Sequence, residues 1–222
     1  MKTHLALKMA HADPLPDPFR DEDVRYPSEL VEHFVREFTE AGDVVLDPFA
    51  GYGTTLKVSE RLGRVAFGVE LDPRKVAWVR KSLRQPQNVY QADARNLSAL
   101  SLPPVDFAMT SPPYMNRGDT EDPLSAYQVD GRGYEAYLQD LSVVFHQVRD
   151  LLKPSGRLVI EVANLKSGGV VTTLAWDIGR LVADLMRFEG EVVVCWDRYG
   201  YGYDHSYCLV YSVEPANGQR RG

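Results

Sequence analysis

Residues 44–55 of the chain read Val-Val-Leu-Asp-Pro-Phe-Ala-Gly-Tyr-Gly-Thr-Thr. The apolar run that opens this stretch is typical of a short strand buried in a sheet. The two glycines permit a tight turn and a close backbone approach to a ligand, and the threonines begin a helix that is expected to end at Gly63. This strand–turn–helix unit predicts an α/β protein whose ligand site lies at the carboxyl end of the strand.

The rest of the chain repeats the alternation of strand and helix. Further strands are expected at residues 65–69, 88–91, 105–110, 157–162, 191–197 and 206–213, and further helices at 30–38, 73–83, 134–151 and 171–188. Strands that alternate with helices pair in parallel and are covered by helices on both faces. Because the link at residues 199–204 is rich in glycine and aromatic residues, we expect a mostly parallel seven-stranded sheet with a terminal antiparallel hairpin.

The composition indicates one globular domain. The chain has 222 residues, with 25 Lys and Arg against 31 Asp and Glu, so its formal net charge is −6. A hydrophobic fraction of 44% excludes a largely disordered chain, and two cysteines exclude a disulfide scaffold and favour a reducing cytoplasm. We expect an irregular arm at residues 1–27, the main fold at 28–213 and a loose tail at 214–222. No apolar run reaches the roughly 18 residues of a membrane helix, so no membrane partner is expected.

Acidic residues end three of the predicted strands. Glu70 can accept hydrogen bonds from both hydroxyls of a ribose, and Asp93 can accept one from an adenine amino group. Asp47 would repel a pyrophosphate but suits the cationic amino end of a methionine group. The third glycine of the dinucleotide pattern is also missing, because threonines follow Gly53. A plain glycine turn, and a capping role for Asp93, are the alternatives when each feature is taken alone.

The fourth strand ends in Thr-Ser-Pro-Pro-Tyr, residues 110–114. Two prolines cannot donate to a sheet ladder, so the strand must stop here with a rigid backbone. The Ser111 side chain and the Pro112 carbonyl can accept the hydrogens of an exocyclic amine, while Tyr114 stacks on the ring that carries it. The alternative is a proline-rich turn with a surface tyrosine.

Together, the glycine loop and this tetrad resemble those of the S-adenosylmethionine-dependent amino-methyltransferases of DNA. The resemblance covers residues 26–213 and includes the turn at residues 153–157. It implies a Rossmann-like class I methyltransferase fold and S-adenosyl-L-methionine as the cofactor. A tetrad that begins with serine is most similar to the N4-cytosine branch, because adenine-N6 enzymes more often begin with Asp or Asn. By this resemblance, the cofactor site comprises Asp47, Phe49, Gly51, Gly53, Thr54, Glu70 and Asp93, and the target amine is held by Ser111, Pro112, Pro113 and Tyr114.

The positions of the cysteines exclude one reaction class. Methylation of C5 of a pyrimidine needs a cysteine nucleophile, which in those enzymes follows the fourth strand. Cys195 and Cys208 fall instead in the last two strands, where both are expected to be small buried apolar residues. We therefore expect direct in-line transfer to nitrogen, driven by positioning. No metal site is predicted.

Two departures from the family pattern leave the target open. Many N4-cytosine enzymes place the tetrad before the glycine loop, whereas here the loop comes first. The longest candidate for target recognition, residues 115–133, is too short for a folded reading domain and is interpreted as a lid or a base-edge loop.

Three functions stay open at this level. The first is a DNA amino-methyltransferase, cytosine N4 ahead of adenine N6, either with little sequence recognition of its own or with target recognition supplied by a partner protein or an oligomer. The second is a methyltransferase of exocyclic amines in structured RNA, with a glutamine-amide methyltransferase as a remoter relative. The third is a non-enzymatic nucleotide-binding subunit, which the presence of both intact motifs disfavours. For a nucleic-acid partner, DNA before RNA, the net charge of −6 predicts modest affinity with a shallow salt dependence.

Overall fold

The computed structural model describes residues 2–11, 15, 17, 19, 24–125, 132–198 and 201–213. The predicted tail at 214–222, and parts of the predicted arm, of the loop at 115–133 and of the link at 199–204, lie outside the described residues. Among the helices of the described residues, none combines the length and apolar character needed to span a bilayer.

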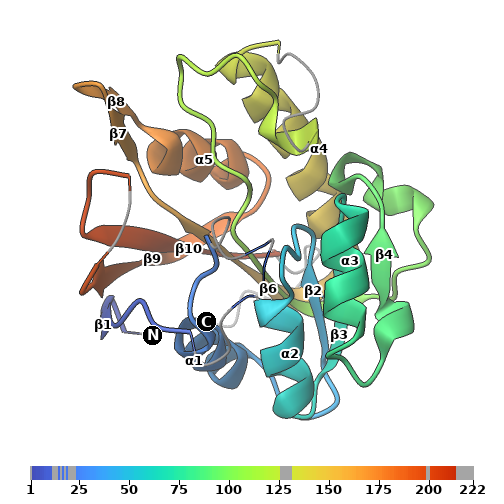
Figure 1. Cartoon of the computed structure of the whole chain (residues 1–222). Coiled ribbons are helices and arrows are strands. Elements are labelled where there is room, and N and C mark those ends of the chain that lie inside the picture. The colour runs from blue at the N-terminus through green and yellow to red at the C-terminus, as the bar shows by residue number, and fades with distance from the viewer. Residues whose placement is uncertain are drawn as a thin grey trace, which may run out of the picture.

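The main sheet has eight strands in the order β1-β9-β10-β6-β5-β2-β3-β4 (Figure 1). Its strands are β1 (His4–Leu7), β2 (Val44–Asp47), β3 (Val65–Glu70), β4 (Val89–Gln91), β5 (Val105–Thr110), β6 (Leu152–Val162), β9 (Arg187–Trp196) and β10 (His205–Ser212). A separate antiparallel hairpin is formed by β7 (Leu165–Ser167) and β8 (Val170–Thr172). The helices are α1 (Ser28–Phe38), α2 (Thr54–Arg61), α3 (Pro73–Arg80), α4 (Tyr134–Leu151) and α5 (Leu174–Ala183), with short 3-10 turns at Pro86–Asn88, Ala94–Ala99 and Pro123–Ser125.

The predicted pattern of strand directions is confirmed. Strand β10 is antiparallel to both of its neighbours, β6 and β9, and every other pairing in the main sheet is parallel. The seven strands expected from the sequence are all present, so the α/β class with a terminal antiparallel hairpin holds.

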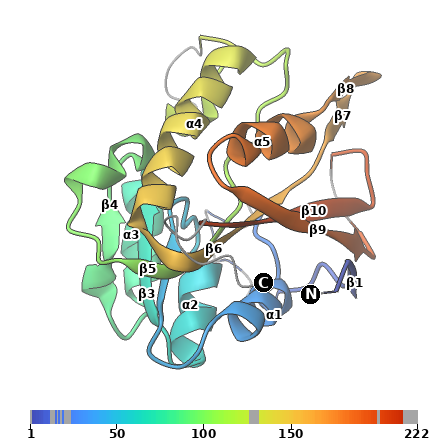
Figure 2. The same ribbon diagram turned by 180° about the vertical axis from the view of Figure 1, so that it is seen from behind.

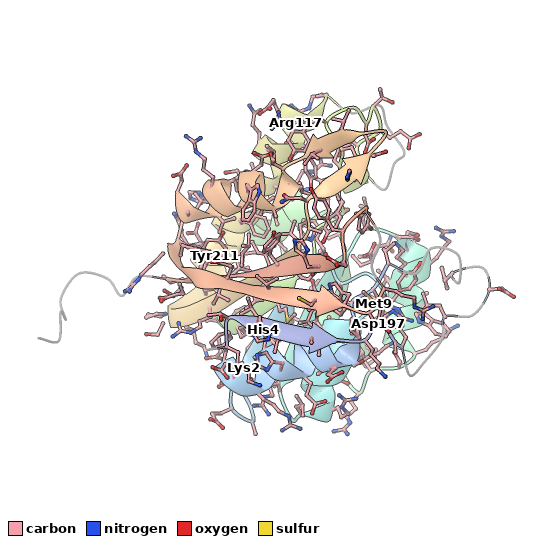
Figure 3. All side chains as sticks on the ribbon, turned by 90° about the vertical axis from the view of Figure 1, so that its left-hand side faces the viewer. Lys2, His4, Met9, Arg117, Asp197 and Tyr211 are labelled. Carbon is pink, nitrogen blue, oxygen red and sulfur yellow. The ribbon has the colours of Figure 1, made fainter. Side chains whose placement is uncertain are left out.

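Two predictions about the ends of elements were wrong. The arm is not wholly irregular, because β1 pairs in parallel with β9 and makes the sheet eight-stranded instead of seven-stranded. Beyond it, the Met9 N–H donates to Asp197 Oδ1 at 2.8 Å, and Figure 3 shows these two residues side by side. The last helix is also shorter than predicted at both ends, because the apolar residues at 170–172 form β8 before α5 begins, and β9 begins at Arg187. The four residues of β1 are too few for the sequence pattern to distinguish an edge strand from a loop.

Helices cover both faces of the sheet (Figures 1 and 2). Alternate residues of each central strand point to opposite faces. Val45 and Phe107 pack with Phe34 of α1 on one face, where α2 and α3 also lie. On the other face, Leu46 of β2 packs with Leu141 of α4, and α5 lies beside α4. The central strands are therefore buried on both sides, and only their ends can carry a ligand site.

The parallel strands bring five chain segments to one edge of the sheet. Strands β2 to β6 all run in the same direction, so the residues at and after their carboxyl ends lie next to one another. Gly68 of β3 allows the segment after β2 to come close: a Cβ there would lie 2.6 Å from Leu56 Cδ2 and 3.0 Å from Ala50 Cβ. The packing of α2 against the sheet therefore depends on a glycine that the sequence did not single out.

Replacement of Gly68 tests this close approach. Gly68→Ala is expected to lower the free energy of unfolding by about 1–3 kcal/mol, because the added methyl overpacks a filled site. The measurement is urea denaturation followed by circular dichroism. Gly118→Ala is the matched control, since a Cβ there meets nothing within 4 Å. Equal stability of the two variants would contradict the packing argument.

Candidate active site

The glycine loop between β2 and α2 is tied to β3 by its own backbone. The Ala50 N–H donates to the Val69 carbonyl at 2.9 Å, and the Gly51 N–H donates to Glu70 Oε2 at 2.8 Å. Gly53 has a φ of +78°, and a Cβ there would lie 2.7 Å from Val79 Cγ1 of α3. Only glycine meets both conditions, so the tight turn predicted from the sequence is present.

Asp47 lies beneath this loop, with 2% of its surface exposed. Its Oδ1 accepts hydrogen bonds from the Phe49 N–H at 3.1 Å and from Thr110 Oγ1 at 2.7 Å. Its Oδ2 accepts one from the Tyr26 hydroxyl at 3.3 Å, and that hydroxyl is also 2.6 Å from Thr55 Oγ1. Burial raises the pKa of Asp47 to about 6, although the hydrogen bonds oppose the change. The carboxylate thus joins β2, β5 and the segment before α1.

Glu70 ends β3 and Asp93 follows the end of the neighbouring β4 by two residues, and both accept hydrogen bonds. Glu70 Oε1 accepts from the Asp72 N–H at 2.7 Å, and burial raises the pKa of Glu70. A carboxylate has about four lone-pair sites, so Glu70 keeps capacity for two ribose hydroxyls. Burial alone would raise the pKa of Asp93, but hydrogen bonds from Arg95 outweigh it and lower that pKa. Asp93 also caps the turn at Ala94–Ala99, which matches the alternative reading of this residue.

The other two predicted cofactor residues, Phe49 and Thr54, lie before and after the two glycines of the loop. Phe49 is half-buried and packs against the core on the α4 side of the sheet. Thr54 is the first residue of α2 and is partly exposed. The structure therefore brings all seven predicted cofactor residues to one region, the carboxyl ends of β2, β3 and β4.

The tetrad follows β5 and meets a buried carboxylate on β6. Glu161 is 4% exposed, and its Oε2 accepts hydrogen bonds from Ser111 Oγ at 2.9 Å and from the Tyr114 hydroxyl at 3.0 Å. The Pro113 carbonyl accepts a hydrogen bond from the Tyr137 hydroxyl of α4 at 2.8 Å. The tetrad is therefore fixed from two sides, with its serine and tyrosine hydroxyls aimed at the same oxygen.

Sequence reasoning missed Glu161 as a site residue. The signal was available, because a glutamate in the apolar run Val-Ile-Glu-Val at residues 159–162 is a charge inside a predicted buried strand. Tyr26 and Tyr137 carried no such signal, since a tyrosine near a helix is common. Tyr201 was also missed; its ring contacts that of Tyr114 with centroids 5.1 Å apart.

The edge of the sheet is rich in carboxylates. Asp47, Glu70, Asp93 and Glu161 all lie at the carboxyl ends of strands, and Arg95 pairs with Asp93 at 2.6 Å. Such an edge repels a pyrophosphate and favours a cation. The residues present therefore fit a sulfonium cofactor with an ammonium group better than they fit a dinucleotide.

One prediction about the cysteines was wrong. Cys208 is buried as expected, but Cys195 is exposed. Val194 and Trp196 of β9 point to the α1 face, so Cys195 points to the opposite face, where it lies across from His205 of β10. The alternation of a strand sets this difference, because the two faces at this position are not equally covered.

Part of the chain matches a known family. Residues 17–81, which contain the glycine loop, match the profile of the N6/N4 methyltransferases, a family described as DNA methylase. Over 52 residues the chain is 42% identical to the type II methyltransferase M.BglII of Bacillus subtilis. That alignment covers 23% of this chain and 14% of M.BglII.

Solved structures show the fold. The crystal structure of TrmN from Thermus thermophilus has a TM-score of 0.60 and 21% identity, over 84% of this chain and 48% of TrmN. SMU.1697c from Streptococcus mutans, solved in complex with SAH, has a TM-score of 0.55 and 14% identity, over 85% of this chain and 98% of that protein. Residues 17–81 are therefore similar to the N6/N4 methyltransferases, and the chain has the class I methyltransferase fold.

Proposed function

We propose that this protein transfers a methyl group from S-adenosylmethionine to an exocyclic amino nitrogen of a DNA base. The observation that carries the proposal is the pair of hydrogen bonds from Ser111 and Tyr114 to buried Glu161, formed beside the glycine loop. The family profile over residues 17–81 supports DNA as the substrate class. We take cytosine N4 ahead of adenine N6, because the tetrad begins with serine.

The glycine loop and the acidic strand ends would hold the cofactor. Glu70 would accept from the ribose hydroxyls, and Asp93 from the adenine amino group. Asp47 lies under the loop and would stabilise the ammonium group through its charge. The relation to SMU.1697c, solved with SAH, supports this assignment. S-adenosylmethionine, when bound, supplies an electrophilic methyl group on a sulfonium centre.

The tetrad would orient the amine of the target base. A hydroxyl has one hydrogen, and Ser111 directs its hydrogen to Glu161. The serine therefore presents only acceptor lone pairs to an incoming amine. The Pro113 carbonyl is engaged by Tyr137, and the Pro112 carbonyl would take the second amine hydrogen. With both hydrogens held, the lone pair of the nitrogen points away from the two acceptors.

Glu161 would also receive the proton that the amine loses. Ser111 already donates to this carboxylate, so a proton can pass from the nitrogen to Ser111 Oγ as the serine proton moves to Glu161 Oε2. Tyr114, oriented by the same oxygen, would stack on the base. Both cysteines of the chain lie in β9 and β10, which agrees with transfer to nitrogen and not to carbon.

Target recognition would come from a partner protein or from oligomerisation. The segment after the tetrad is tied to its own chain: the Arg117 N–H donates to Thr172 Oγ1 at 3.1 Å, and its guanidinium pairs with Asp177 at 3.3 Å. Arg117 is therefore engaged by β8 and α5.

Labelled methyl transfer tests the proposed function directly. The protein is incubated with S-adenosylmethionine labelled in the methyl group and with DNA, total RNA or protein, and the products are identified by nucleoside mass spectrometry. We expect N4-methylcytosine in DNA. Label found only in RNA or protein would overturn the proposal, and N6-methyladenine in DNA would move the target to adenine.

Removal of the charge of Glu161 tests the role of the buried carboxylate. Glu161→Gln is expected to lower kcat by about 10²–10⁴-fold, the range for general acid–base groups, because an amide cannot take the proton. Affinity for S-adenosylhomocysteine, measured by calorimetry, stays the same. Glu135→Gln, an exposed change on α4, is the control. A Glu161→Gln variant with wild-type kcat would contradict the proton path.

Asp47→Asn tests the buried charge under the glycine loop. The pKa of Asp47 is raised from 3.8 to about 6, so between these pH values the folded state holds a proton that the unfolded chain releases. Stability therefore falls as the pH rises through this window, by roughly 3 kcal/mol. We expect Asp47→Asn to unfold with a higher free energy than the wild type at pH 7, and with the same free energy below pH 4.

The same variant reports on the cofactor. Loss of the charge is expected to weaken S-adenosylhomocysteine binding by about tenfold or more, because a charge-assisted contact contributes roughly 1.5–3 kcal/mol. Urea denaturation at two pH values and calorimetry give the two results. A stability difference that does not depend on pH would contradict the raised pKa, and unchanged affinity would contradict the cofactor role.

A further inference from the structure

A row of aromatic side chains lies on one face of β10, outside the site described above. The rings of Trp176 and Tyr207 have centroids 4.9 Å apart, those of Tyr207 and His205 5.3 Å, and those of His205 and Tyr203 5.4 Å. We call Trp176, Tyr207, His205 and Tyr203 the aromatic row. Figure 3 looks onto β9 and β10, with β1 below them and Arg117 above.

The aromatic row leads to the tetrad. Strand β10 runs antiparallel to β6, so His205, at its start, lies at the carboxyl edge of the sheet. Tyr201 precedes the row by two residues, and its ring contacts that of Tyr114 in the tetrad. The Lys166 N–H of β7 donates to the Tyr201 carbonyl at 2.8 Å, which holds the end of the link beside the tetrad. One end of the row is thus two residues from Tyr201, which lies next to the proposed base site.

The row runs from the core to the surface, since Tyr207 is partly buried and packs against the hydrophobic core. Trp176 is 51% exposed, whereas Ala175 and Ile178 of the same helix are buried. The planes of the three ring pairs meet at 50°, 89° and 74°, so none of these pairs is a parallel stack. In an edge-to-face pair the neighbour's edge covers one ring face, so the exposed Trp176 is the ring of the row best placed to take a planar ligand.

We propose that the aromatic row binds an unpaired stretch of DNA next to the target base, with the flanking bases stacked on its rings. The proposal rests on the proposed function and names its substrate as single-stranded or locally opened DNA. Every base has a π-face, so stacking on aromatic side chains tolerates any sequence. Sequence-tolerant binding agrees with the engagement of Arg117, after the tetrad, by β8 and α5 of the same chain.

Charge favours a stacked single strand over a duplex. Duplex binding depends on neutralising many phosphates, which suits a basic surface. This chain has a net charge of −6, and Asp204 lies beside His205 at 3.2 Å. Lys166 of β7 is exposed, and its backbone N–H donates to the Tyr201 carbonyl of the link. Stacking, and not charge, would therefore carry most of the affinity.

Binding of a short mixed-sequence DNA strand to the whole protein tests the row by fluorescence anisotropy. Trp176→Ala and Tyr207→Ala are each expected to weaken binding by about 5- to 150-fold, the effect of losing roughly 1–3 kcal/mol of base stacking. Tyr207→Phe keeps the ring and is expected to bind like the wild type. Phe188→Ala is the matched control: Phe188 is 44% exposed and contacts Tyr211, at the other end of β10.

A second measurement uses the exposed thiol of Cys195, which lies across from His205. Its rate of alkylation is expected to fall when the DNA strand is bound. Wild-type affinity in Trp176→Ala and Tyr207→Ala, or an equal loss in Phe188→Ala, would overturn the proposal. Tighter binding of a single RNA strand or of duplex DNA would overturn the choice of unpaired DNA.

Two readouts separate this proposal from the proposed function. Binding of S-adenosylhomocysteine and methyl transfer to free deoxycytidine do not require the row, so both are expected to be unchanged in Trp176→Ala. If the wild type shows neither S-adenosylhomocysteine binding nor methyl transfer, while its affinity for the DNA strand depends on Trp176, the proposed function is contradicted and the proposal for the aromatic row is not. If the wild type shows both activities while its affinity for the DNA strand does not depend on Trp176, only the proposal for the aromatic row is contradicted.

Discussion

The buried carboxylate of Asp47 is the constraint on which the ligand edge of this protein depends. It accepts hydrogen bonds from the loop that follows it, from Thr110 on the neighbouring strand and from Tyr26 before the first helix. A buried charge is costly unless it is hydrogen-bonded, so these partners must stay in place. One side chain thereby fixes the glycine loop relative to the strand that carries the tetrad. The cost of burying it appears as the raised pKa of Asp47.

Glu161 has the corresponding role on the other side of the edge. It receives two hydroxyls of the tetrad at one oxygen, and this sets the direction of the serine hydrogen and the position of the tyrosine ring. The serine then acts only as an acceptor toward an amine. The chemistry proposed for the tetrad therefore depends on a residue about fifty positions further along the chain, on the adjacent strand.

Local patterns in the sequence were enough to predict most helices and strands and to identify both the glycine loop and the tetrad. The apolar runs of the central strands, the glycine turn and the two prolines of the tetrad each reflect a short-range physical requirement. Prediction failed where the decision was not local. The residues of β1 form a strand only because β9 offers an edge to pair with. Cys195 is exposed because helices cover the two faces of β9 unequally, and α5 is short because β8 precedes it and β9 begins soon after it.

The sequence by itself determined the α/β class, the order of the elements and the residue types at the strand ends. These follow from hydrophobic periodicity and from the conformational limits of glycine and proline, which act within a few residues. Only the tertiary structure decided which side chains meet. Glu161 under the tetrad, Tyr26 on Asp47 and Trp176 beside Tyr207 all join segments distant in sequence. Strand register and helix packing place such pairs, and no single segment of the chain encodes either one.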